Sequence, residues 1–142
     1  LGAGCNFEGK RPFRQLGFNV NVLEPGESLG LYHRENHQEG FLVVAGVCLL
    51  VVEGEERTLE AWDFFHCPPG TAHVLVGAGD GPSVVVAFGA RGGRKGLVYL
   101  ESPVAAAHDA AVERETTKPA EAYAPIPPST RTRYREGWLP DV

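Results

Sequence analysis

The sequence predicts an all-β domain built as a small barrel or a β-sandwich. Its 142 residues include 18 glycines and 11 prolines but no methionine, a composition typical of a chain with many short turns. Between residues 18 and 89, short apolar runs alternate with turns that contain glycine or proline. Seven or eight short strands at this regular spacing are typical of such folds, and the length fits a single domain.

Alternating side chains place the first two strands. Phe18, Val20 and Val22 recur with a period of two before the turn at residues 25–26. A second strand is expected over residues 29–35, where His33 and Glu35 share one face because successive side chains point to opposite sides. Further strands are expected at residues 41–45, 48–52, 57–59, 64–67, 72–76 and 84–89.

The chain divides into three parts: an irregular N-terminal arm at residues 1–17, a barrel at 18–100, and a helix with a proline-rich arm at 101–142. Ser102 as N-cap and Pro103 at the first helical position predict a helix that continues through the alanine-rich segment to about residue 115. A second helical turn is expected at residues 117–123. Aromatic and apolar side chains of the arm are expected to pack on the barrel or on a neighbour, namely Tyr123, Ile126, Tyr134 and Trp138.

Charge and cysteine content exclude several classes of protein. Thirteen basic and eighteen acidic residues give a formal charge of -5 without long runs of one sign, which argues against nucleic acid or an anionic membrane as a partner. Three widely spaced cysteines suggest reduced thiols and a cytoplasmic protein. The apolar runs are too short to span a membrane. Because the chain begins at Leu1 and not at methionine, a trimmed upstream segment is an open expectation.

Histidines and glutamates gather in two stretches, residues 25–46 and 62–77, which hold four of the five histidines. His33 and Glu35 share a face, Glu39 begins the next strand, and His73 begins a later one. If these strands are neighbours, four nitrogen and oxygen donors converge at one end of a barrel. The two carboxylates would neutralise a divalent cation, and an unpaired carboxylate facing an apolar interior would be costly. The residues therefore predict a metal site formed by His33, Glu35, Glu39 and His73.

The two stretches resemble the two motifs of the cupin family, G(x)5HxH(x)3-4E(x)6G and G(x)5PxG(x)2H(x)3N. The matching residues are His33, Glu35, Glu39 and Gly46 in the first motif, and Pro68, Gly70 and His73 in the second. This sequence departs from the pattern at three positions. Glu35 replaces a histidine, Trp62 replaces the first glycine of the second motif, and Gly77 replaces its asparagine.

The resemblance implies a cupin-type double-stranded β-helix barrel, a homodimer, and a divalent metal such as manganese, iron, zinc or nickel. Two arrangements of ligands remain open. Either Glu35 binds the metal with His33, Glu39 and His73, or His37 takes the place of the missing histidine and Glu35 faces a substrate. A ligand-binding pocket without metal is the third possibility.

The expected pocket would take a small molecule. Gln38 would orient Glu39 from outside the metal site. Alternating positions on the expected strands give mostly apolar walls, formed by Asn21, Leu31, Phe41, Val43, Phe64 and Leu75. Three functions fit: a metal-dependent enzyme, dioxygenase-like or isomerase-like, a non-catalytic module that binds a metal or small ligand, and a structural dimer with a vestigial site.

Overall fold

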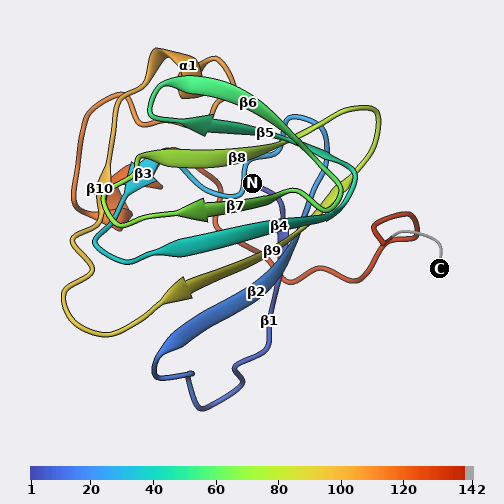
Figure 1. The fold of residues 1–142 in the computed structure, drawn as a ribbon, viewed down its shortest axis with the longest axis horizontal. Helices are drawn as coiled ribbons and strands as arrows, with labels where there is room; N and C mark the ends of the chain where they lie inside the picture. Colours follow the sequence, from blue (N-terminus) through green and yellow to red (C-terminus); the bar gives the residue numbers. More distant parts are fainter. Residues whose placement is uncertain (140–142) are drawn as a thin grey trace.

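Two five-stranded antiparallel sheets face each other in the computed structural model, which describes residues 1–139 (Figure 1). The first sheet has the order β1-β2-β9-β4-β7, with β1 (Ala3–Asn6), β2 (Leu16–Leu23), β9 (Ser83–Ala90), β4 (Glu39–Ala45) and β7 (Phe64–Cys67). The second has the order β10-β3-β8-β5-β6, with β10 (Val98–Tyr99), β3 (His33–Arg34), β8 (His73–Ala78), β5 (Val47–Val52) and β6 (Glu55–Glu60). The predicted all-β barrel is confirmed.

An apolar core fills the space between the sheets. It consists of inward-facing side chains at alternate strand positions, among them Leu23, Phe41, Val43, Leu50, Leu75 and Val85. All six are at most 3% exposed. Residues of one parity from both sheets therefore point to the same interior, which is the arrangement that the metal-site prediction requires.

Two predicted turns have the backbone conformation that their residues favour. Glu53 and Gly54 both have positive φ, 49° and 79°, and join β5 to β6 as a two-residue hairpin. Gly46, between β4 and β5, has φ 75°, and a Cβ atom there would lie 2.6 Å from the carbonyl oxygen of Pro82. Only glycine fits this close approach without displacing backbone.

The strand expected at residues 29–35 is wrong for most of its length, since only His33–Arg34 forms β3. The backbone just before β3 forms hydrogen bonds with segments that lie far away in the sequence. The amide of Leu29 donates to the carbonyl of Leu75, and that of Tyr32 donates to the carbonyl of Ala110. This stretch is held in place by the barrel and the C-terminal segment together, and it does not run as a regular ladder.

The N-terminal arm is less irregular than predicted. Residues Ala3–Asn6 form β1, which pairs antiparallel with β2 from Ala3 opposite Val22 to Asn6 opposite Asn19. Its glycines and mixed polarity gave no period-two signal, because an edge strand buries little of its surface. The first sheet thus extends one strand beyond the expected barrel.

The C-terminal helix starts as predicted but is shorter. Ser102 Oγ accepts a hydrogen bond from the amide of Ala105, and α1 covers only Pro103–Ala106. The predicted continuation to about residue 115 is wrong, because Asp109 adopts φ 54° and the carbonyl of Ala110 accepts the amide of Tyr32. Pairing with the barrel thus ends the helix. The second helical turn is confirmed as α2, Pro119–Ala122.

Part of the arm packs as expected. Tyr123 and Ile126 join a small apolar cluster around Leu31, and Trp138 Nε1 donates to Glu24 Oε1 at 3.0 Å. Tyr134 stays 62% exposed, with its ring edge-on to Trp138. The last three residues of the predicted arm lie outside the described residues.

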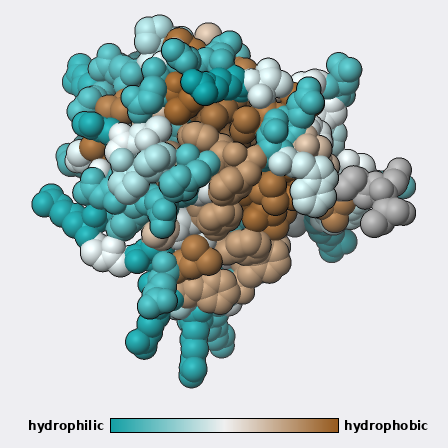
Figure 2. Space-filling model, viewed as in Figure 1, coloured by the Kyte–Doolittle hydropathy of each residue, from teal (hydrophilic) through white to brown (hydrophobic). Residues whose placement is uncertain are grey.

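Apolar side chains are exposed on the first sheet and in the turn that leads into β7. Trp62 is 79% and Phe64 54% exposed, and Phe64 stacks on Phe88. Figure 2 shows a band of hydrophobic residues across the middle of the face in view, bordered by hydrophilic ones. The homodimer expected for this chain stays a prediction. No helix within residues 1–139 is long and apolar enough to cross a membrane.

Candidate metal centre

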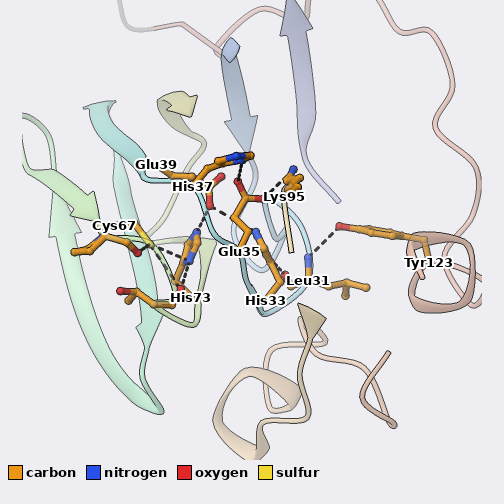
Figure 3. A network of polar contacts seen from close by, with 11 residues as sticks. Leu31, His33, Glu35, His37, Glu39, Cys67, His73, Lys95 and Tyr123 are labelled. Atoms are coloured by element: carbon orange, nitrogen blue, oxygen red, sulfur yellow. Dashed lines mark hydrogen bonds and ion pairs between the residues drawn. The ribbon is translucent and has the colours of Figure 1, made fainter. Parts of the chain in front are cut away.

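Three of the predicted ligands converge at the barrel interior, from three different strands (Figure 3). His33 in β3 lies opposite His73 at the start of β8 in the antiparallel register. Glu39 begins β4 in the facing sheet. Its Oε2 atom is 3.3 Å from Nε2 of His73 and 3.7 Å from Nε2 of His33. One ligand atom of each residue lies within 4.8 Å of the others.

Backbone carbonyls fix the orientation of both imidazole rings. Nδ1 of His33 is 2.7 Å from the carbonyl oxygen of Leu31, and Nδ1 of His73 is 3.1 Å from that of Thr71. Because a carbonyl oxygen only accepts, each Nδ1 carries the proton and donates it. In the neutral rings, the lone pairs on Nε2 then point at Glu39, which is the usual arrangement of metal-binding histidines.

The centre of the cluster is suited to a cation. Among the described residues, buried Nε2 of His73 and buried Oε2 of Glu39 lack a hydrogen-bond partner. Two imidazole lone pairs and a carboxylate would repel one another unless a proton or a metal ion lies between them. The donor set of two nitrogens and one oxygen fits a divalent transition metal.

The pKa values of Glu39 and His33 both shift in the direction that favours a negative carboxylate beside a positive charge. Burial opposes ionisation of Glu39, but its close contacts with the imidazoles of His33 and His73, and the charge attraction once a ring is protonated, outweigh it and lower the pKa of Glu39 to about 2. Burial also disfavours the charged form of His33. Its contacts with Glu39 and with the carbonyl of Leu31 outweigh that effect, so the pKa of His33 is raised. Glu39 therefore stabilises a proton on His33.

Cys67 lies directly behind His73, with its Sγ atom 3.2 Å from Nδ1. Burial, together with the nearby carboxylates, raises the pKa of this thiol to about 12. The side chain therefore stays a neutral thiol on the side of the ring opposite the ligand nitrogen, and it acts as packing, as expected for a small buried side chain.

Glu35 and His37 lie beside this group and interact elsewhere. The buried carboxylate of Glu35 pairs with Nζ of Lys95 at 2.8 Å. His37 places Nδ1 3.9 Å from Glu35 Oε1 and Nε2 2.5 Å from the carbonyl oxygen of Gly92. The strand β3 ends at Arg34, so the alternation of side chains along a strand does not extend to Glu35. The side chain of Glu35 therefore need not point in the same direction as that of His33.

Two cavities open from the metal centre. The smaller, of about 210 Å³, is lined mainly by leucines and by Phe41, Tyr99 and Tyr123. The larger, of about 430 Å³, is lined by more polar residues, including Asn19, Glu35 and His37. Glu39 and Lys95 line both cavities. The candidate metal centre thus lies between an apolar and a polar cavity.

The predicted pocket residues differ in position. Leu31, Phe41 and Leu75 line the smaller cavity, whereas Val43 is fully buried in the core. Asn21 donates a hydrogen bond of 2.6 Å to Asn19, which lines the larger cavity.

Two further predicted residues lie away from the metal centre. Phe64 is on the outer surface, as described above. Gln38 Oε1 lies 3.1 Å from Nε2 of His66 at an exposed position, so this side chain contacts His66 there.

Sequence reasoning did not place Lys95, Tyr99 or Tyr123 at the cavity. All three come from segments after the last long strand, where no periodic pattern marks an inward direction. One signal was available for Lys95. A glutamate buried among apolar residues needs a cationic partner, and the loop at residues 90–96 is rich in basic residues.

Comparison with known proteins identifies the class of protein. Residues 19–89, half of the chain, match the cupin domain family. The chain belongs to this family, as the two sequence motifs predict. A comparison with curated proteins found no match.

Solved structures show the same fold at low sequence identity. A protein named as a sugar phosphate isomerase from Acidithiobacillus ferrooxidans has a TM-score of 0.61 and 22% identity, with 68% of this chain and 62% of that chain covered. A sugar phosphate isomerase from Silicibacter pomeroyi gives 0.56 and 26%, with 63% and 59% covered. The chain therefore spans about three fifths of these two proteins. A cupin 2 domain-containing protein from Halorhodospira halophila gives 0.58 and 18%, with 78% and 77% covered.

Proposed function

We propose that this protein is a metal-dependent cupin in which His33, Glu39 and His73 hold a divalent cation beside a small-molecule pocket. The observation that carries the proposal is the orientation of the two imidazoles. Each Nδ1 donates to a backbone carbonyl, so each Nε2 presents a lone pair to Glu39. Because these backbone hydrogen bonds fix both rings, little further ordering of the ligands would be needed for metal binding, which lowers its cost.

Three protein ligands leave coordination positions open for a small molecule. Two histidines and one carboxylate are a set that iron(II) and manganese accept, and zinc and nickel bind similar donors. A bound metal would act as a Lewis acid toward an oxygen atom of the ligand. The chain itself supplies the rest: leucines and Phe41 keep water from one side, and Glu35 with Lys95 gives the other side polar groups.

The fold does not select one reaction. Similar structures carry the names sugar phosphate isomerase, oxalate decarboxylase and DMSP lyase, which are different chemistries. We propose turnover of a small molecule at the open metal positions, with isomerisation and dioxygen-dependent oxidation as the two reactions to test first. Binding without turnover is the alternative outcome.

Metal analysis tests the proposal directly. Protein purified without added metal, and again after loading with manganese or iron(II), should contain about one equivalent of metal. His73→Ala and Glu39→Gln should lose it, while His66→Ala, which removes an exposed histidine outside the cluster, should keep it. Less than about a tenth of an equivalent in the loaded native protein, or full occupancy of the His73→Ala variant, would refute the metal site.

Turnover is tested on the loaded protein. Oxygen consumption and product formation would be followed across small acids, phenols and sugar phosphates, with the Glu39→Gln variant as the control for metal-independent chemistry. Ligand binding measured by calorimetry with no turnover of any compound would favour the non-catalytic module over the enzyme.

A further inference from the structure

Lys95 is held at the metal centre by a buried carboxylate. The side chain of Glu35 is only 4% exposed, and its Oε2 atom is 2.8 Å from Nζ of Lys95, whose own side chain is 58% exposed. Burying a carboxylate is costly, so the ammonium group is drawn to it. The backbone of the same loop is fixed as well, because the carbonyl of Lys95 accepts the amide of Asn36 at 2.7 Å.

The ammonium group of Lys95 has donors to spare. It carries three N–H bonds, and its contact with Glu35 is an ion pair, which leaves N–H groups that can donate to a ligand. Lys95 lines both the apolar and the polar cavity, together with the metal ligand Glu39. A ligand bound at the open metal positions therefore also meets a fixed lysine.

The charges around the centre favour a ligand with one negative charge. Lys95 and Glu35 cancel each other, and Arg91 at the rim is engaged by Glu8, with 2.7 Å between Nη1 and Oε2. Glu39 contributes one negative charge, and a divalent cation contributes two positive charges. The total is one positive charge in a partly desolvated site, which a monoanion neutralises.

We propose that the site selects a small monocarboxylate, whose carboxylate lies between the metal and Lys95 and whose short apolar body fills the smaller cavity. This inference rests on the proposed metal site. The walls around that body are Leu29, Leu31, Leu75 and Leu97 with Tyr99. Its volume of about 210 Å³ lies below the roughly 300–1,000 Å³ of pockets for drug-sized ligands, so the body has few carbon atoms.

The test compares butyrate with butyramide, which has nearly the same shape and no charge. Both are titrated into manganese-loaded protein by calorimetry, with metal content measured on each sample. Butyrate should bind at least about tenfold more tightly than butyramide. Lys95→Gln should remove about tenfold of butyrate affinity and leave butyramide affinity unchanged, while Lys95→Arg should keep part of the preference.

Two further variants make the comparison specific. Arg94→Gln removes a charge from an exposed position on the same loop, and it should bind butyrate as the native protein does. Glu35→Gln combined with Lys95→Gln leaves no unpaired buried charge, so it tests Lys95 if the single variant does not fold. It keeps the net charge of the site but removes the ammonium donor, and it should still bind butyrate more weakly than the native protein does.

Equal binding of butyrate and butyramide, or equal losses in the Lys95→Gln and Arg94→Gln variants, would overturn the inference while metal binding stands. Tighter binding of inorganic phosphate than of butyrate, through Lys95, would overturn the choice of a monocarboxylate. Absence of metal in the loaded protein would instead refute the proposed function, and the charge balance used here would fail with it.

Discussion

Replacing Glu39 by glutamine should change the pH dependence of stability in the metal-free protein. Glutamine has nearly the same shape as glutamate, so packing at the start of β4 is preserved and only the charge is lost. The carboxylate lies 3.3 Å from His73 and 3.7 Å from His33, and its side chain is 18% exposed. Its interaction with a protonated imidazole is thus only weakly screened by solvent.

The size of the effect follows from the pKa of Glu39. That pKa falls from 4.5 to about 2 on folding, and one pKa unit corresponds to about 1.4 kcal/mol, so ionised Glu39 stabilises the fold by up to about 3 kcal/mol. A lowered pKa means that this stability is present above pH 4.5 and is lost as the pH falls toward 2. The same interaction raises the pKa of His33 above 6.5. The stability that comes from the contact of His33 with Glu39 is therefore present below pH 6.5 and is lost as the pH rises through the raised pKa of His33.

The difference in free energy of unfolding between native protein and Glu39→Gln should therefore be largest between about pH 4.5 and 6.5 and should shrink on both sides. Urea unfolding in the presence of a chelator, at closely spaced pH values, measures it. Glu60→Gln, at an exposed position of β6, serves as control and should show no such maximum. A difference that does not vary between pH 2 and pH 8 would show that Glu39 is not paired with the histidines, and the cation argument would fail.

Three further predictions concern a close backbone contact at Gly77, the hydrogen bond of Tyr123, and the oligomeric state. Gly77→Ala should lower the free energy of unfolding by about 1–3 kcal/mol, because a Cβ there would collide with backbone carbonyls at the end of β2, whereas Gly81→Ala meets nothing and should change it by less than about 1 kcal/mol. Tyr123→Phe removes the hydroxyl that accepts the amide of Leu31 at 3.3 Å and should cost about 1 kcal/mol in urea unfolding, unlike Tyr134→Phe at the surface. Sedimentation velocity should give about twice the chain mass of 15.3 kDa if the predicted homodimer forms, and a monomer would contradict it.

Strand parity predicted which candidate side chains converge wherever the expected strand forms. Glu39 and His73 each begin a regular strand after a turn, and His33 lies in β3 opposite His73, so alternate positions point inward as expected. Glu35 lies one residue beyond β3, where the backbone is held by long-range bonds that no local pattern reveals. Its carbonyl accepts the amide of Gly70, and its side chain pairs with Lys95.

The pocket was harder to predict for two physical reasons. Parity tells which face a side chain joins but not its depth along the barrel, so Phe41 lines the cavity while Val43, two residues on, lies in the sealed core. In β7 both Phe64 and Phe65 are apolar, and a period of two cannot decide between them. The structure turns Phe65 toward the core and Phe64 to the outside.

The candidate metal ligands and the walls of the cavity come from different parts of the chain, which limits what family membership can predict. His33, Glu39 and His73 all lie within residues 19–89, the part that matches the cupin family. Lys95, Tyr99 and Tyr123, which bound the cavity, come from the segment after it. The matched part therefore carries the three candidate metal ligands, and the following segment shapes the cavity beside them. Reactions named for similar structures cannot be transferred through the matched part alone, because the groups that would choose the substrate lie outside it.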